Sequence, residues 1–306
     1  MTDIENTRSN SYFQDTPLQL KELFSILWKG KILIIMIAAV SFIIAAIGAL
    51  NSPDLYRSSA ILNVVERGGG GNITSAAISF AGLSVAQKGV KGPRYVNTVR
   101  SRAFFKHLVE TDEDFLPALM AAQRYDKKSE KLIYDSSYDV VNKKWLAEKP
   151  HYLEAYIYYI QKMGIVFHRD RNIIDISIEH ISPFAAKDMV ESIIFKADTM
   201  LRTLDLEVSS ESLAYLTKAI PNTQQIAIRG AMNEMVMSQL ETQMMASIGP
   251  TYIIQVVDPP FVPLYRFAPN RTFRSLSAGV VGLVFGIVFI LLRHFLKPYI
   301  ASNKKD

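Results

Sequence analysis

The pattern of apolar positions is dominated by two uninterrupted runs, one near each end of the chain. Residues 32–50 are nineteen consecutive positions without a charged side chain, and residues 275–292 are eighteen. A helix rises about 1.5 Å per residue, so each run would span about 28 Å, close to the thickness of the hydrocarbon core of a bilayer. Charge-free runs of this length are rare in soluble cores. We therefore predict two transmembrane helices, at residues 32–50 and 275–292.

Two spans place both tails on one side of the membrane and the segment between them on the other. The tails, residues 1–31 and 293–306, carry seven basic residues close to the spans, whereas the flanks of the intervening segment carry five. This difference favours cytoplasmic tails under the positive-inside rule. We expect a multi-pass protein of the bacterial inner membrane, with residues 51–274 in the periplasm.

Strand patterns occur at four places between the spans. Ile174, Ile176 and Ile178 alternate with polar residues, which predicts a half-buried strand at 173–179. A turn at 169–172 would join it to a strand at 165–168. Two further strands are predicted at 55–65, before the glycine run 68–71, and at 252–257.

The remaining periodic segments predict helices. Apolar residues at helical spacing occur in 95–110, 151–162 and, most extensively, 183–220. Ser182 and Pro183 are a favourable helix start, Pro221 must end or kink this helix, and 223–248 resumes it. The fold class expected is an α+β membrane protein whose periplasmic domain has a small α/β base and a long helical arm at about 182–248. Five methionines between 232 and 245 fit equally an adaptable packing surface and ordinary core packing.

Residues capable of catalysis or of binding a cofactor are not evident. The chain has no cysteine, and its five histidines lack metal-ligand spacing. No Lys-Ser or Lys-Thr follows the glycine run, so there is no phosphate-binding loop, and the acids 112–114 fit a solvated loop. Between residues 32 and 292 the chain has 26 basic and 24 acidic residues, a balance that argues against nucleic acid. We predict a non-enzymatic protein without metal or cofactor.

Several local motifs resemble one family. The segment 19–31 resembles the amphipathic entry to the first span of Wzz-type polysaccharide co-polymerases, and Pro53 and Tyr56 with the strand 57–65 resemble their first periplasmic strand. The segment 256–260, followed by Arg271, resembles their proline-rich lead into the second span. The lead comprises Pro259, Pro260, Pro263 and Pro269, and the glycines that follow within the span are Gly279, Gly282 and Gly286.

The resemblance implies a ring-shaped homo-oligomer that regulates polysaccharide chain length. Its partner would be the polymerase of the inner membrane, and the growing lipid-linked glycan is a further possible partner. A kinase domain and a tail tyrosine cluster, found in capsule and exopolysaccharide members, are missing here, which favours lipopolysaccharide O-antigen. The alternative is an inner-membrane adaptor for export of capsule or exopolysaccharide. The residues do not decide between them, whereas the neighbouring genes would.

The glycines of the second span are candidate packing positions. Gly282 and Gly286 lie one turn apart on one helix face, with Gly279 on a similar side. Small residues let another helix approach closely in lipid. The partner could be the first span of the same subunit, a neighbouring subunit or the polymerase; alternatively, glycine is simply frequent in membrane helices.

Overall fold

The structure is a computed structural model that describes residues 27–65 and 91–302, without the side chains of 295–302. Its chain divides into two compact units, one comprising residues up to 52 and from 269 onward, the other residues 53–268. Most of the predicted amphipathic entry at 19–31, and all of the glycine run 68–71, lie outside the described residues.

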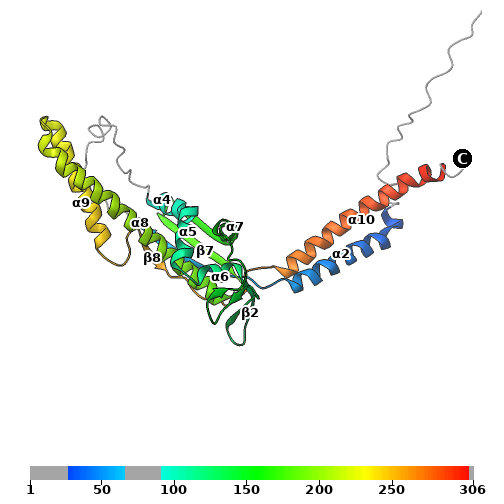
Figure 1. Ribbon diagram of the computed structural model, residues 1–306. Helices are drawn as coiled ribbons and strands as arrows, with labels where there is room; N and C mark the ends of the chain where they lie inside the picture. The colour runs from blue at the N-terminus through cyan, green and yellow to red at the C-terminus, as the bar shows by residue number, and fades with distance from the viewer. Residues whose placement is uncertain (1–26, 66–90, 303–306) are drawn as a thin grey trace, which may run out of the picture. The chain divides into compact units, whose positions relative to one another are not determined.

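The first unit is a pair of long apolar helices, α2 (Lys31–Asn51) and α10 (Arg271–Ser302). In the described chain, Lys31–Asn51 and Arg271–His294 are long and apolar enough to cross a membrane. The two helices lie side by side (Figure 1). The side-chain oxygen of Asn270 accepts hydrogen bonds from the Thr272 hydroxyl at 2.9 Å and the Phe273 N–H at 3.3 Å, which caps the start of α10.

The second unit is built on a four-stranded antiparallel sheet in the order β6-β7-β1-β8. Its strands are β1 (Tyr56–Val64), β6 (Met163–His168), β7 (Ile173–His180) and β8 (Ile254–Asp258). β1 pairs with β7 from Tyr56 opposite His180 to Asn63 opposite Ile173. Asn172, in the turn between β6 and β7, has a φ of 56°, a left-handed conformation that asparagine tolerates. All four predicted strands are confirmed, with small shifts at their ends.

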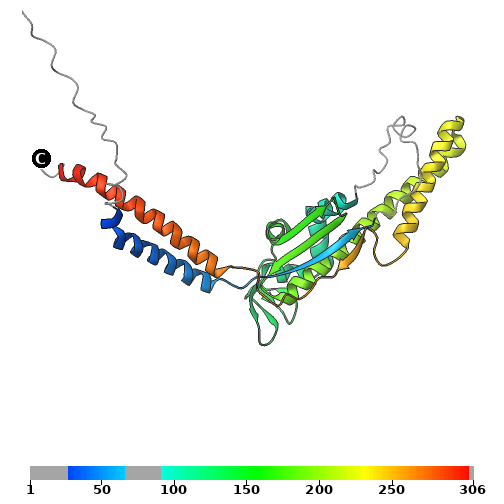
Figure 2. The same ribbon diagram turned by 180° about the vertical axis from the view of Figure 1, so that it is seen from behind.

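Helices cover one face of this sheet, and Figure 2 shows the strands in front of them. Ile174, Ile176 and Ile178 of β7 are fully buried on the covered face. On the other face β7 places Asp175, Ser177 and Glu179. The alternation read from the sequence therefore separates the core from the solvent.

Four short helices complete the covered side: α4 (Lys91–Val99), α5 (Arg102–Thr111), α6 (Phe115–Met120) and α7 (Tyr152–Lys162). The single helix predicted at 95–110 is wrong, because the chain forms α4 and α5 there. The break falls at Ser101, whose hydroxyl accepts the Phe104 N–H at 3.0 Å and caps α5. A serine at this position offers the backbone an alternative to continuing the first helix.

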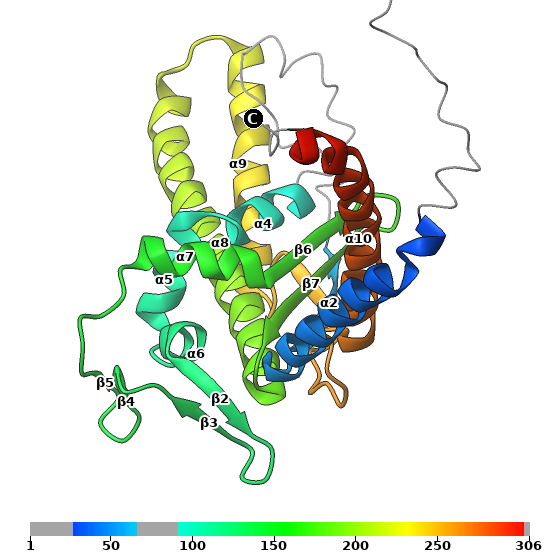
Figure 3. The same cartoon turned by 90° about the vertical axis from the view of Figure 1, so that its right-hand side faces the viewer.

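Two small hairpins follow α6 in the chain (Figure 3). The first pairs β2 (Ala122–Asp126) with β3 (Lys131–Tyr134), and the second pairs β4 (Tyr138–Asp139) with β5 (Lys144–Trp145). Glu130 and Lys143, in the two turns, have positive φ angles of 53° and 49°. Neither hairpin was predicted from the sequence.

The helical arm consists of α8 (Pro183–Ala219), a 3₁₀ turn η1 (Ile220–Asn222) and α9 (Ile226–Ser247). The Ser182 hydroxyl caps α8 by accepting the Ala185 N–H at 3.3 Å. Pro221 lies in η1, where the chain reverses so that α9 runs back along α8 (Figure 1). The predicted long helix and its end at the proline are confirmed.

Candidate functional site

The root of the arm is held by a buried carboxylate on α8. Asp198 is 4% exposed and accepts the backbone N–H groups of Tyr252 at 2.7 Å and Ile253 at 2.8 Å. These two residues lead from the end of α9 into β8. The contact therefore fixes the return strand of the arm against the helix that begins it, and it satisfies two backbone donors that would otherwise be buried without a partner.

A second carboxylate, Asp205, lies two turns further along α8. Arg94 of α4 donates to both of its oxygens, at 3.0 and 2.5 Å, and the Tyr252 hydroxyl donates to one at 2.8 Å. The hydrogen bond to Asp205 raises the pKa of Arg94, while burial, followed by the bond to Asp205, raises the pKa of Tyr252. α4, α8 and the segment before β8 are thus joined by one hydrogen-bonded network, in which Arg94 stays charged and the Tyr252 hydroxyl stays protonated.

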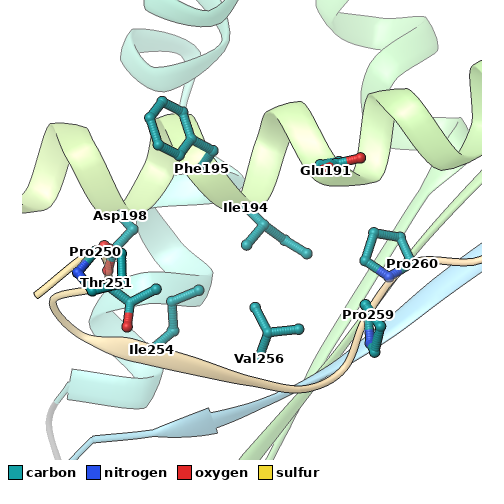
Figure 4. A pocket seen from close by; sticks show the side chains of 10 residues that line it. All are labelled: Glu191, Ile194, Phe195, Asp198, Pro250, Thr251, Ile254, Val256, Pro259 and Pro260. Carbon is teal, nitrogen blue, oxygen red and sulfur yellow. The ribbon is translucent and has the colours of Figure 1, made fainter.

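The proline-rich lead borders a hollow of about 220 Å³ beside α8. Figure 4 shows the hollow, which is lined by Glu191, Ile194, Phe195, Asp198, Pro250, Thr251, Ile254, Val256, Pro259 and Pro260. Its walls are mostly apolar, and Asp198 already accepts two backbone N–H groups. The lining contains no pair of groups that would serve as nucleophile and base.

The four predicted prolines of the lead take different environments. Pro259 and Pro260 line the hollow, Pro263 is buried, and Pro269 immediately precedes the cap of α10. The Ser58 hydroxyl of β1 donates to the Phe261 carbonyl at 2.7 Å. Since proline has no N–H and fixes φ, the lead runs beyond β8 without continuing that strand. It also contacts β1 where the Arg57 guanidinium lies 3.4 Å from the centre of the Phe267 ring.

The three predicted glycines of the second span differ in how closely α2 approaches them. A Cβ built on Gly282 would lie 2.6 Å from the Ser41 hydroxyl oxygen and 3.1 Å from the Ala38 Cα, and one on Gly286 would lie 3.1 Å from the Ile34 Cα. At Gly279 the nearest atom, in Phe42, is at an ordinary 3.6 Å. Of the candidate partners, the first span of the same subunit is the one found against Gly282 and Gly286.

The arm exposes apolar side chains along its outer half. The predicted apolar face of α8 is buried at Met189, Ile193 and Ala197, whereas Val208 is 59% and Tyr215 70% exposed. On α9, Met237 and Met244 are 68% and 62% exposed. The remaining three methionines of the cluster, Met232, Met235 and Met245, are half-buried. An apolar surface of this kind is typical of a protein–protein contact.

The titratable residues of the described chain form no arrangement suited to catalysis. Among residues 27–65 and 91–302, no three His, Asp or Glu side chains gather where they could hold a metal ion. The acids 112–114 have structural partners, since Asp112 accepts from the Ser192 hydroxyl and Asp114 pairs with Lys143 at 2.8 Å. His180 is buried, with Nε2 at 2.9 Å from the Ala118 carbonyl and Nδ1 accepting the Ser182 N–H at 3.0 Å, and burial lowers its pKa.

Comparison with known proteins confirms the resemblance seen in the sequence. Residues 17–110 match the model of the Wzz family, described as chain length determinant protein. The match extends over α2, β1, α4 and most of α5. Since proteins of this family are generally not enzymes, it also agrees with the absence of catalytic motifs. No curated protein matches the chain.

Two solved structures are similar at low identity. A full-length bacterial polysaccharide co-polymerase is 15% identical, with a TM-score of 0.37, and the alignment covers 92% of this chain and 99% of that one. A fragment of WzzB, a polysaccharide co-polymerase from Salmonella Typhimurium, is 11% identical with a TM-score of 0.28, covering 71% of this chain and 100% of that one.

Proposed function

We propose that the protein regulates the chain length of a surface polysaccharide as a non-enzymatic partner of the polymerase. The polysaccharide that we propose is lipopolysaccharide O-antigen. The observation that carries the proposal is the family match over residues 17–110. The arrangement of a mixed α+β unit between two membrane-spanning helices supports it. So does the lack of catalytic and metal-binding clusters among the described residues.

The proposal places the chain in the bacterial inner membrane with residues 53–268 in the periplasm. α2 and α10 then cross the bilayer, and the arm extends into the compartment where the lipid-linked glycan grows. The pair of spans would bring the regulator into the plane of the polymerase. The close approach at Gly282 and Gly286 packs the two spans against each other, and we propose that the polymerase contacts the outer surface of this pair.

The apolar outer half of the arm supports assembly into a homo-oligomeric ring. The exposed apolar side chains include Val208 and Tyr215 on α8 and Met237 and Met244 on α9, and a monomer would leave them in water. A neighbouring copy of the arm would cover them. The proline-rich lead would then transmit the position of the ring to the second span, because it is the direct connection between β8 and α10.

Deletion of the gene tests the proposed function. A regulator biases how long a separate enzyme acts, so the deletion strain should still make surface glycan but lose its preferred length. The measurement is the ladder of glycan lengths on a gel, with complementation by the intact gene as control. Complete loss of surface glycan would instead support an export adaptor for capsule or exopolysaccharide, and an unchanged ladder would refute both functions.

A further inference from the structure

Both connections to the spans leave from one end of the sheet unit. The N–H of Leu55 donates to the Ala268 carbonyl at 2.8 Å, and the N–H of Phe267 donates to the Leu55 carbonyl at 2.7 Å. Leu55 is four residues beyond the end of α2, and Ala268 is three residues before the start of α10. Extended chain covers at most about 3.6 Å per residue, so both connections to the spans are short.

The turn of the first hairpin lies at this same end. Lys127, the first residue after β2, has its Nζ 3.0 Å from a carboxylate oxygen of Asp54 and 5.9 Å from the centre of the Tyr56 ring. The ring of Tyr125 lies edge-on to Tyr56, with centroids 6.4 Å apart. Asp54 also lies 3.4 Å from Arg266, on the chain leading to α10. The hairpin is therefore anchored to both membrane connections.

The hairpin presents cations at this position. Its exposed side chains include Arg124, Lys127, Lys128 and Lys131, against the two acids Asp126 and Glu130. Asp126 is occupied locally, since it accepts the Lys128 N–H at 3.0 Å and the Ser129 hydroxyl at 2.7 Å. The hairpin therefore carries four basic residues against two acids, and Lys127 is paired with Asp54.

The chain beside the hairpin carries the apolar groups of a membrane interface. Leu264 and Tyr265 are 87% and 85% exposed and precede α10 by only a few residues. Exposed tyrosine next to a span is typical of the headgroup region, where the ring is apolar and its hydroxyl remains hydrated. Basic and aromatic groups thus occur together at the end of the unit from which both spans continue.

We propose that the β2–β3 hairpin is a membrane-surface contact that binds the phosphate groups of acidic phospholipids. Lys128 and Lys131 would supply the charge, and Leu264 and Tyr265 would enter the headgroup region beside them. Clusters of basic residues next to a span bind acidic lipid by electrostatic attraction. The proposal rests on the two-span topology of the proposed function, and it adds a second attachment that holds the base of the sheet unit against the bilayer.

The absence of cysteine makes a site-specific test possible. Ser129→Cys, in the turn of the hairpin, gives a single thiol in the full-length chain, which is labelled with a polarity-sensitive fluorophore. The labelled protein is placed in nanodiscs of phosphatidylcholine alone or of phosphatidylcholine mixed with phosphatidylglycerol. We expect a blue shift of the emission in the acidic nanodiscs, and loss of that shift at high salt, where the charges are screened.

Charge reversal identifies the residues responsible. Lys128→Glu with Lys131→Glu should abolish the lipid-dependent shift. The matched control, Arg169→Glu with Arg171→Glu, makes the same change in charge in the turn between β6 and β7. That turn lies at the far end of β1 from Tyr56, and its reversal should leave the shift intact.

Three results would overturn the proposal: equal emission in the two nanodiscs, a shift that survives reversal of Lys128 and Lys131, or a response to a polyprenyl diphosphate but not to phosphatidylglycerol. The last would assign the turn to the lipid carrier of the glycan. Because both faces of a nanodisc are accessible, the emission does not depend on which way the protein crosses the bilayer. The experiment also measures no glycan. Failure here is therefore distinct from failure of the proposed function, which is judged from the glycan ladder.

Discussion

Asp198 and Tyr252 are 54 positions apart in the chain, and the carboxylate of the first accepts the backbone N–H of the second at 2.7 Å. The same carboxylate accepts the N–H of Ile253 at 2.8 Å. Asp198 also pairs with Arg202, one turn further along α8, at 3.6 Å, so this buried acid binds both the main chain and a cation. It can therefore fix the path of the polypeptide where the arm rejoins the sheet.

Replacing this acid should destabilise the protein strongly. Asp198→Ala removes two hydrogen bonds to a charged acceptor and leaves two buried N–H groups without a partner, so we expect a loss of about 3 kcal/mol in the free energy of unfolding. Denaturant unfolding of the full-length protein in detergent, followed by circular dichroism, measures it. Asp188→Ala is the control, since Asp188 is 72% exposed on the same helix. A loss equal to that of the control would contradict the structural role of Asp198.

The Arg94–Asp205 pair should show measurable coupling. Arg94 is 41% and Asp205 15% exposed, so solvent screening reduces the value of the two hydrogen bonds between them. We expect a double-mutant cycle of Arg94→Ala and Asp205→Ala to give about 1 kcal/mol of coupling. The exposed pair Lys187–Glu191 on α8 should give about 0.3–0.5 kcal/mol. Equal coupling in the two cycles would show that the bidentate geometry contributes nothing.

Buried His180 should make stability fall in acid. Burial, and to a lesser extent nearby Lys162, lowers the pKa of His180 in the folded protein. The unfolded chain therefore binds the proton first, and stability is lost as the pH falls below about 6.5. His180→Gln should reduce this dependence by at most about 1.4 kcal/mol per pH unit. Unfolding at pH 7.5 and at progressively lower pH measures it, and parallel curves for the two proteins would exclude His180 as the cause.

Local sequence signals predicted the regular elements well. The alternation at Ile174, Ile176 and Ile178 identified β7 because one face of that strand is buried and the other faces solvent. Ser182, Pro183 and Pro221 marked the ends of α8 because capping and the missing proline N–H act within a few residues. Such signals do not depend on which distant segment packs against them.

Features that depend on contacts between residues far apart in the chain could not be predicted from the sequence. Asp198 falls on the buried side of α8, between Ala197 and Leu201. A single acid at such a core-facing position is the one sign in the sequence that the carboxylate has a structural role. Its partners lie beyond the arm, so their identity required the fold. The hairpins at 122–145 were missed because strands of two to five residues are too short to show a period of two. The break at Ser101 was missed because apolar residues keep helical spacing across it.

The proposed topology can be tested at both ends of the chain. Two spans require both termini on one side, and the excess of basic residues near the tails favours the cytoplasm. Fusions of a reporter before Met1 or after Asp306 should be active only for a cytoplasmic reporter. A fusion inserted in the turn at Arg169–Asn172 should be active only for a periplasmic reporter. Periplasmic activity at either terminus would reverse the orientation.

The glycines of α10 give the final prediction, which concerns helix packing in the membrane. Side chains at Gly282 and Gly286 would collide with Ser41, Ala38 and Ile34 of α2. In lipid, hydrophobic burial does not drive two helices together, because the lipid tails are themselves apolar. Close van der Waals contact between the helices stabilises their association instead. Gly282→Leu with Gly286→Leu should therefore force the two spans apart. Since insertion depends on hydrophobicity rather than on pairing, the variant should still reach the membrane at normal levels, yet its preferred glycan length should shift or disappear.

Gly48→Leu is the matched control, because Gly48 lies in α2 and no atom of another helix lies within 4 Å of its Cβ position. It adds a leucine to the same pair of helices without touching their interface, so its glycan ladder should match that of the wild type. Membrane level and oligomer size, measured for each variant, separate a packing effect from loss of protein. If the double glycine variant keeps the wild-type length distribution at normal membrane levels, close approach of the spans is not needed for regulation. The glycines would then reflect only the tolerance of membrane helices for small residues.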